Sequence, residues 1–253
     1  MTAGRNGGES NDGWRGGSGQ WVPGMRVIET PSPNFNDRQL PITMIVLHYT
    51  GMPTARQALG RLCDPAAEVS AHYLVDEDGT IHRLVPDDRR AWHAGKSHWR
   101  EIEDVNSASL GIEIVNPGHE HGYRRFPDQQ VEAVIRLVAH LKDRYEITRG
   151  NIVGHSDIAP ARKRDPGELF PWHRLARLRL ALPRPTKNLM DPFWGEAAFC
   201  LALERFGYDV TDRMAAIMAF QRRFRPELID GEIDAECRMI LLALLLPKPQ
   251  GDD

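Results

Sequence analysis

The chain has few cysteines, only three among its 253 residues. Their number is odd, they are scattered along the chain, and no C-x-x-C pair occurs. This pattern argues against a disulfide framework and against a metal site built from thiolates. We therefore expect Cys63, Cys200 and Cys237 to be small buried apolar side chains.

Long hydrophobic runs and a large excess of charge are also missing. The longest apolar run, Ile240–Leu246, falls far short of the about 20 residues that span a bilayer. The net charge of −3 gives no electrostatic reason to expect nucleic acid. The composition, 41% apolar and 26% charged, is typical of a globular protein. The sequence therefore predicts no transmembrane segment and no nucleic-acid partner, and it carries no signal for the oligomeric state.

The first 24 residues lack the features of an export signal. They are rich in Gly, Ser and Asn, and they contain neither an apolar core nor a lipobox-like cysteine. We expect residues 1–24 to be a disordered leader and the protein to stay in the cytoplasm. A misassigned or truncated start would instead make it periplasmic.

Strand and helix patterns alternate along the first two thirds of the chain. The capping pattern Thr54–Gln57 opens one helix, and Pro127 with Asp128 opens another. In the strand that contains Glu113, apolar residues at alternate positions define one face. The expected order is strand 42–48, helix 54–62, hairpin strands 72–75 and 80–84, strand 109–115, a helix from 127 and strand 151–155. This order predicts an α/β fold with a mixed central β-sheet flanked by helices.

A proline-rich segment divides the chain near residue 183. We expect a domain at 25–182, a linker at 183–190 and a small helical domain at 191–248. Apolar residues at helical spacing predict three helices in the last unit, the first of them including Phe193 and Leu201.

Three potential metal ligands follow predicted strands. His48 ends the strand at 42–48, His155 ends the strand at 151–155, and Asp165 follows ten residues later. Two imidazoles and one carboxylate form a ligand set that suits a catalytic Zn²⁺ and leaves one position open. Lys163, two residues before Asp165, is suited to stabilising an oxyanion. The alternative is that His48 belongs to the core and that His155 and Asp165 are turn and cap residues.

Glu113 interrupts an otherwise apolar strand, Leu110–Val115. A carboxylate there is costly unless it is paired or faces a cleft. Partial burial would raise its pKa toward the range that suits a general base. The alternative is a structural salt bridge.

Five ordered motifs give the chain a family resemblance: L-H-Y-T-G at 47–51, S-A-H-Y-L-V-D-E-D-G at 70–79, R-A-W-H-A-G at 90–95, S-L-G-I-E-I-V-N-P-G at 109–118, and the segment 154–167. Together they resemble the zinc-dependent N-acetylmuramoyl-L-alanine amidases of the type-2 amidase family, in the branch with a C-terminal peptidoglycan-binding module. The resemblance covers roughly 27–180 and then the C-terminal unit.

The resemblance implies a role for each of these residues. His48, His155 and Asp165 match the Zn²⁺ ligands, Glu113 the base that activates water, and Lys163 the residue that stabilises the tetrahedral intermediate. The expected reaction is hydrolysis of the amide between the lactyl group of muramic acid and L-Ala of the stem peptide. Its expected substrates are soluble (anhydro)muropeptides in peptidoglycan recycling. Residues expected to contact the substrate are Trp92, His93 and Ala94; His119 and His121 are expected in a solvated loop.

The C-terminal unit resembles a three-helix peptidoglycan-binding module in its segments 206–210, 219–224 and 230–234. The glycine-rich turn usual after the first helix is replaced by Asp209–Asp212. This departure leaves two interpretations open, a weakened glycan-binding module and a mainly structural unit.

Other functions remain as alternatives. A non-catalytic peptidoglycan-recognition protein would share the fold but typically lacks a metal ligand. An envelope amidase would act on intact peptidoglycan instead of soluble fragments. A zinc peptidase would cut within the stem peptide, but the sequence contains no H-E-x-x-H motif.

Overall fold

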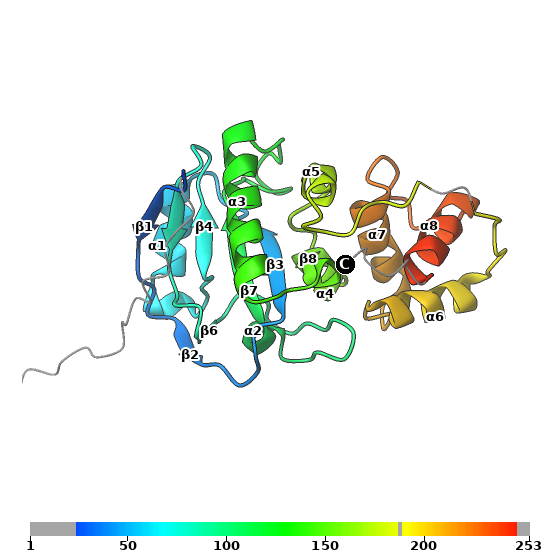
Figure 1. Ribbon diagram of the computed structural model, residues 1–253, viewed down its shortest axis with the longest axis horizontal. Helices are drawn as coiled ribbons and strands as arrows, with labels where there is room; N and C mark the ends of the chain where they lie inside the picture. The colour runs from blue at the N-terminus through cyan, green and yellow to red at the C-terminus, as the bar shows by residue number, and fades with distance from the viewer. Residues whose placement is uncertain (1–23, 187–188, 247–253) are drawn as a thin grey trace, which may run out of the picture.

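A mixed six-stranded β-sheet forms the centre of the computed structural model, which describes residues 24–186 and 189–246 (Figure 1). The predicted leader therefore lies, except for Gly24, outside the described residues. The strand order is β1 (Val27–Glu29), β5 (Ile81–Arg83), β4 (Tyr73–Val75), β7 (Ser109–Ile114), β3 (Met44–Tyr49) and β8 (Ile152–Gly154). Within this sheet, only the β4–β5 pair is antiparallel. The predicted α/β fold with a mixed sheet flanked by helices is confirmed.

Three short strands were not predicted. β1 lies at the sheet edge, while β2 (Phe35–Asp37) and β6 (Arg89–Ala91) form a separate antiparallel pair. Each spans only three residues and includes charged or polar side chains, so none shows a hydrophobic period. The end of the last predicted strand also differs, because β8 stops at Gly154 and His155 begins a short helix, α4 (His155–Ile158).

The two longest strands, β3 and β7, carry different side chains on their two faces. Ile45 and Leu47 pack in one cluster with the helix α3 (Asp128–Arg144), which covers that face of the sheet (Figure 1). Met44 and Val46 belong to a second cluster on the opposite face. Since side chains alternate along a strand, His48 lies on this second face. Its register partner is Glu113 of β7, which brings the two polar side chains together.

The helix α1 (Ala55–Leu62) begins as the sequence predicted. The Thr54 hydroxyl accepts a hydrogen bond from the Gln57 backbone N–H at 3.3 Å, and Thr54 and Gln57 side chains are 3.2 Å apart. The remaining short helices of this part are α2 (Val105–Ala108), α5 (Trp172–Arg177) and two 3-10 turns, Pro65–Ala67 and Arg149–Asn151.

Three helices form the C-terminal unit: α6 (Glu196–Phe206), α7 (Arg213–Phe224) and α8 (Ala235–Leu245). Phe193, expected in the first helix, precedes it and is exposed. The Asp209–Asp212 segment ends in a helix cap, because the Asp212 carboxylate accepts the Ala215 N–H at 3.0 Å. Asp212 thus stabilises the start of α7.

The helical unit and the sheet share a hydrophobic core. One continuous cluster contains Val46 and Ile158 from the sheet side together with Phe199 and Phe220 from the helices. Figure 1 shows α7 lying next to α4. The C-terminal helices therefore pack directly on the elements that surround His48 and His155.

A buried carboxylate fixes this contact. Asp157 of α4 accepts hydrogen bonds from the Tyr208 hydroxyl and the Gly154 N–H, both at 2.7 Å. Arg223 of α7 lies 3.9 Å from the same carboxylate, and its guanidinium stacks 3.2 Å from the centre of the Trp172 ring. Because α4 begins with His155, the helical unit is anchored on the helix that carries this histidine.

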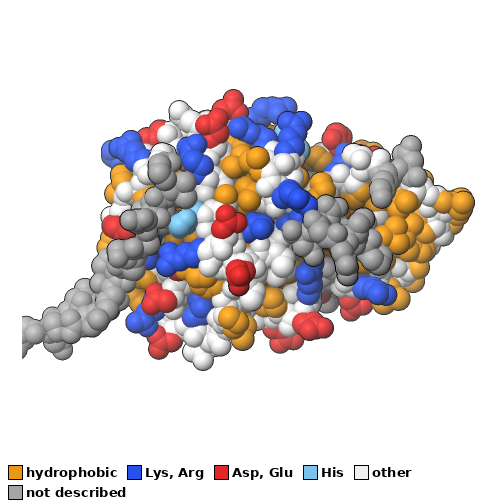
Figure 2. Space-filling view, viewed as in Figure 1, with side chains coloured by type: hydrophobic (Ala, Val, Ile, Leu, Met, Phe, Trp, Pro, Cys, Tyr) orange, Lys and Arg blue, Asp and Glu red, His pale blue; other side chains and the backbone are white. Residues whose placement is uncertain are grey.

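The described surface is apolar at one end. Figure 2 shows hydrophobic side chains at the end of the molecule where α6 and α8 lie. The most exposed large apolar residues, Met190 and Phe193, belong to this C-terminal part. Across the described ranges, no helix has both the length and the apolar character required to cross a bilayer.

Candidate functional site

Three side chains converge at the carboxyl edge of the parallel strands. The Nδ1 atoms of His48 and His155 are 2.8 Å apart, and Asp165 Oδ2 lies 3.1 Å from the first and 3.0 Å from the second. All three residues are buried. His48 comes from β3, His155 from the residue after β8, and Asp165 from the following loop. The sequence-predicted ligand set is therefore brought together in space.

Hydrogen bonds on the far side of each ring define its tautomer. His155 Nε2 lies 3.1 Å from the Ala94 carbonyl oxygen, which can only accept, so this nitrogen carries the proton. His48 Nε2 lies 3.0 Å from His93 Nδ1 and donates to it. Both Nδ1 atoms then present lone pairs toward Asp165. Such hydrogen-bonded support is what metal-binding histidines have in proteins.

Three acceptors this close require a positive charge between them. Burial, and then the charge of His155, lowers the pKa of His48 to about 4, so its ring is neutral at pH 7. Burial alone would raise the pKa of Asp165, but the two histidines, His155 above all, outweigh burial and hold it well below the usual range. Two imidazole nitrogens beside an ionised carboxylate fit a divalent cation that prefers nitrogen and oxygen ligands. The three residues form a candidate metal site.

A chain of hydrogen bonds behind His48 ends in the backbone. His93 accepts from His48, and its own Nε2 lies 3.2 Å from the Ser109 hydroxyl. That hydroxyl donates to the Val105 carbonyl at 2.5 Å. Because the last acceptor cannot donate, the direction of every bond back to His48 is fixed. Gly111 makes room for this arrangement, since a Cβ there would come within 2.4 Å of the His93 ring.

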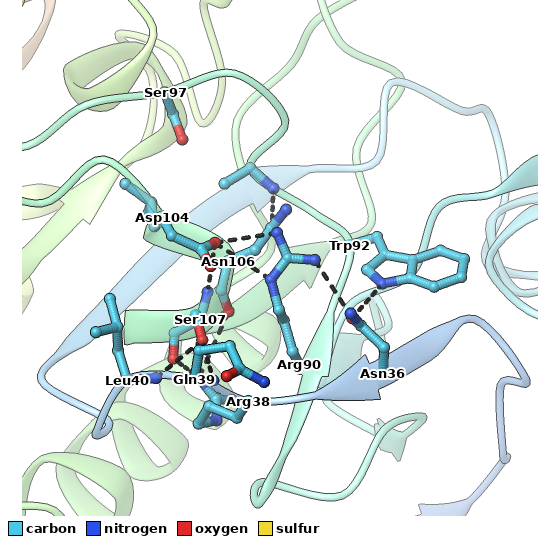
Figure 3. Close-up of polar contacts among 12 residues, drawn as sticks. Asn36, Arg38, Gln39, Leu40, Arg90, Trp92, Ser97, Asp104, Asn106 and Ser107 are labelled. Carbon is cyan, nitrogen blue, oxygen red and sulfur yellow. Dashed lines mark hydrogen bonds and ion pairs between the residues drawn. The ribbon is translucent and has the colours of Figure 1, made fainter.

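Hydrogen bonds to two asparagine side chains fix the loop that carries Trp92, His93 and Ala94. The Asn106 side-chain oxygen accepts the N–H groups of His93 and Ala94 at 3.0 and 2.8 Å. Figure 3 shows Trp92 and Arg90 both directed at Asn36, whose side-chain oxygen lies 2.8 Å from the Trp92 indole nitrogen. These contacts keep the two acceptors of the histidine rings, His93 Nδ1 and the Ala94 carbonyl, in place.

A cleft of about 690 Å³ opens above the three ligands. Trp92 and His93, two of the predicted substrate contacts, line it, and so do Glu113 and Lys163. Ala94 is fully buried and is not among the lining residues. The structure assigns Ala94 a different contact, because its carbonyl holds His155 and accepts from Arg162 at 3.0 Å.

Glu113 is a carboxylate of the cleft with one oxygen atom that has no hydrogen-bond partner among the described residues. Its Oε2 is shielded from solvent and makes no hydrogen bond within the described ranges. Burial, followed by the negative charge of Asp165, raises its pKa well above 4.5, while Lys163 opposes the shift. The alternative of a structural salt bridge therefore finds no support among the described residues. A carboxylate with raised proton affinity beside a metal site is suited to accepting a proton.

The sequence analysis missed a second polar cluster on the cleft wall. His119, expected in a solvated loop, is half-buried and stacks on Tyr123 with ring centres 4.4 Å apart. Its Nε2 lies 3.2 Å from both oxygens of Glu168, and its Nδ1 lies 2.9 Å from the Tyr49 hydroxyl. Arg222 of α7 approaches Glu168 at 3.7 Å. The position of His119, just after Pro117-Gly118, was the only sequence signal of this cluster.

Comparison with protein families matches residues 38–168 to the family described as N-acetylmuramoyl-L-alanine amidase. Among curated proteins, the chain is 37% identical over 230 residues to N-acetylmuramoyl-L-alanine amidase AmiD of Escherichia coli strain K12, covering 81% of this chain and 82% of that protein. It is 36% identical over 186 residues to 1,6-anhydro-N-acetylmuramyl-L-alanine amidase AmpD of the same organism, covering 66% of this chain and 96% of that protein.

A solved structure has the same fold. The AmiD amidase of E. coli, in complex with the substrate anhydro-N-acetylmuramic acid-L-Ala-D-γ-Glu-L-Lys, matches with a TM-score of 0.74 and 34% sequence identity. The match covers 84% of this chain and 97% of that chain. The similarity thus extends well beyond residues 38–168.

Proposed function

Since the chain belongs to the N-acetylmuramoyl-L-alanine amidase family, we propose that it hydrolyses the amide between the lactyl group of muramic acid and L-Ala in soluble anhydromuropeptides. As a member of this family it is a hydrolase that acts on a linear amide. The observation that carries the proposal is the convergence of His48, His155 and Asp165 beside the unpartnered Glu113 in one cleft. A protein that only recognises peptidoglycan has no need of this complete set.

The proposed metal is Zn²⁺, held by His48, His155 and Asp165. Three nitrogen and oxygen ligands leave a fourth position open, as in catalytic zinc sites. When bound, the ion supplies a Lewis acid that polarises the scissile carbonyl and acidifies water. Metal analysis of the purified protein tests the assignment, because it identifies the ion and its stoichiometry.

Glu113 and Lys163 carry the proton and charge steps of the proposed mechanism. Glu113 takes a proton from the attacking water and returns it to the nitrogen of the leaving L-Ala. Its raised pKa suits both transfers, since the same group must act as base and then as acid. Lys163 lies on the same cleft wall as Asp165 and stabilises the negative charge that develops on the carbonyl oxygen.

The soluble substrate class rests on the relatives. AmpD is named as an amidase of 1,6-anhydro-N-acetylmuramyl-L-alanine, and AmiD was solved with an anhydromuramoyl tripeptide. Hydrolysis of such fragments for recycling would place the enzyme in the cytoplasm, and cell fractionation with a tagged chain tests this location. The proposed catalytic domain is 25–182, and 191–248 is the proposed peptidoglycan-binding-like helical domain.

The test is a mass-spectrometric product assay with anhydromuropeptide and, separately, with intact sacculi, each with and without a chelator. Chelator-sensitive release of the free stem peptide from the soluble substrate alone is the expected result. Release from sacculi at a similar rate would favour the envelope amidase. Products in which alanine stays attached to the sugar would identify a peptidase instead, and absence of any product would favour a recognition protein.

A further inference from the structure

Arg222 of α7 is a buried arginine that lines the cleft and whose guanidinium is incompletely hydrogen-bonded. Its side chain keeps only 9% of its surface exposed, and its Nε makes no hydrogen bond within 24–186 and 189–246. The nearest carboxylate oxygen is Glu168 Oε2 at 3.7 Å, which is too far for a hydrogen bond. Arg222 is among the residues that line the cleft, so its exposed edge faces the substrate space.

The next residue on the same helix, Arg223, also has a buried nitrogen without a hydrogen bond among the described residues, Nη1, but its surroundings differ. Arg223 stacks on Trp172 and faces the buried carboxylate of Asp157, and it does not line the cleft. Arg223 thus joins α7 to α4, while Arg222 points from the same helix to the other side. Burying a cation without hydrogen bonds costs free energy, so the position of Arg222 calls for a ligand.

The charge that would neutralise Arg222 is only partly present in the protein. Glu168 is shared, because its two oxygens already lie 3.2 Å from the His119 ring nitrogen. Burial, the largest effect, lowers the pKa of Arg222; Glu168 raises it, and Arg164 lowers it further. Five cationic side chains line the cleft against three carboxylates. The cleft wall formed by α7 therefore favours an anion.

We propose that Arg222 binds a carboxylate of the stem peptide, so that the C-terminal helical unit forms one wall of the substrate site. The proposal rests on the function proposed above. A guanidinium matches a carboxylate with two parallel N–H···O bonds. The ligand bound by the related AmiD, which ends in L-Ala-D-γ-Glu-L-Lys, has two such groups: the α-carboxylate of the γ-linked glutamate and the terminal carboxylate. His48, His155, Asp165 and Arg222 line the same cleft, so a substrate whose amide lies at the proposed metal site can extend its peptide toward α7.

The experiment compares three substrates: the anhydromuramoyl tripeptide, an analogue with the glutamate α-carboxylate amidated, and an analogue with the terminal carboxylate amidated. Wild-type protein is expected to lose roughly 10- to 100-fold in kcat/KM on one of the two amidations, chiefly through KM. Arg222→Gln is expected to lose a similar factor on the parent substrate and to treat the parent and that analogue alike. The analogue affected identifies the carboxylate.

Two further variants separate recognition from folding. Arg222→Lys keeps the charge and is expected to retain a reduced preference for the carboxylate. Arg213→Gln removes a charge from the same helix at an exposed position paired with Glu196, and it should keep wild-type discrimination. An Arg222→Gln protein with wild-type discrimination would overturn the proposal, whatever its melting temperature. Wild-type protein that cleaves none of the substrates would overturn the proposed function, and this inference with it.

Discussion

The two walls of the cleft differ in how completely their polar groups are paired. Around the metal site, each histidine nitrogen that faces away from Asp165 has an acceptor, and the chain from His48 ends at the Val105 carbonyl. On the side of the cleft formed by α7, Arg222 lies 3.7 Å from a carboxylate, and its Nε has no hydrogen bond within the described part of the chain. The proposed metal ligands are thus oriented by hydrogen bonds before substrate binds, whereas we propose that Arg222 gains its hydrogen bonds from the substrate.

The two walls also differ in their origin along the chain. The metal site is built where three parallel strands, β7, β3 and β8, end side by side. The proposed recognition side of the cleft is formed by Arg222 of α7. This helix lies beside the cleft because the helical unit packs on α4. The comparison predicts that damage to the first wall abolishes chemistry and that damage to the second changes substrate preference.

The largest effect is expected from His155→Ala. The variant removes a ligand atom and leaves His48 and Asp165 with too few partners for a tight site. We expect loss of bound metal and activity below detection, because the open position for catalysis requires the ion. Metal content and kcat/KM are measured together, with His98→Ala outside the cleft as the control. Full metal content in the His155 variant would remove this residue from the ligand set.

Glu113→Gln should separate metal binding from proton transfer. The amide keeps the size of the side chain and cannot accept the proton, so kcat is expected to fall about 10²- to 10⁴-fold with metal content unchanged. Glu120→Gln, an exposed residue on the rim of the same cleft, is the matched control. A Glu113→Gln variant with wild-type kcat would assign the base to another group.

The raised pKa of Glu113 also predicts the pH dependence. A base works when it is ionised, so activity is complete above the pKa of Glu113 and is lost as the pH falls through it. Burial raises the pKa of Glu113 and a bound cation opposes the shift, so the acid limb of kcat/KM is expected at a higher pH than an ordinary glutamate would give. Metal content measured along the profile shows whether the limb reflects metal loss instead.

Lys163→Met is expected to have a smaller effect than the change at Glu113. The variant keeps the approximate length of the side chain and removes the charge that we propose stabilises the developing oxyanion. Removing one such stabilising group typically lowers kcat about 10²- to 10³-fold. Steady-state kinetics at saturating substrate measure the effect, with Lys96→Met as the control. If only KM rises, Lys163 acts in substrate binding and not in the chemical step.

The residues of the candidate metal site could be predicted from the sequence, whereas the surroundings of Arg222 on α7 could not, and the reason is physical. Ligands at the ends of parallel strands are close in space because of the topology, so His48, Glu113 and His155 could be found from strand patterns and motifs. The alternation in β7 also placed Glu113 opposite the face that packs on α3, and the structure has it so.

The contacts that the sequence did not reveal depend on packing between distant segments. Arg222 and His119 meet through Glu168, and no local pattern encodes how α7 docks on α4. The support for the ligands is equally non-local, because His93 reaches His48 through Ser109 and over Gly111. Ala94 was expected to touch substrate, but its backbone oxygen, which no side-chain motif describes, makes the important contact.

The smallest effect is expected from Ser109→Ala, which tests whether the hydrogen bonds behind His48 orient it for metal binding. Ser109→Ala leaves every ligand in place and removes the acceptor of His93 Nε2, so the proton position on His93 and thus on His48 is no longer fixed. We expect metal affinity to weaken about 10-fold, as for other residues that orient metal ligands. Titration against a competing chelator measures it, and Ser97→Ala, whose hydroxyl donates to the Gly95 carbonyl at 3.2 Å, is the control. A lower melting temperature with unchanged metal affinity would mean that Ser109 only stabilises the fold. The contrast with Arg222 would then depend on the three proposed metal ligands alone and not on the hydrogen bonds behind them.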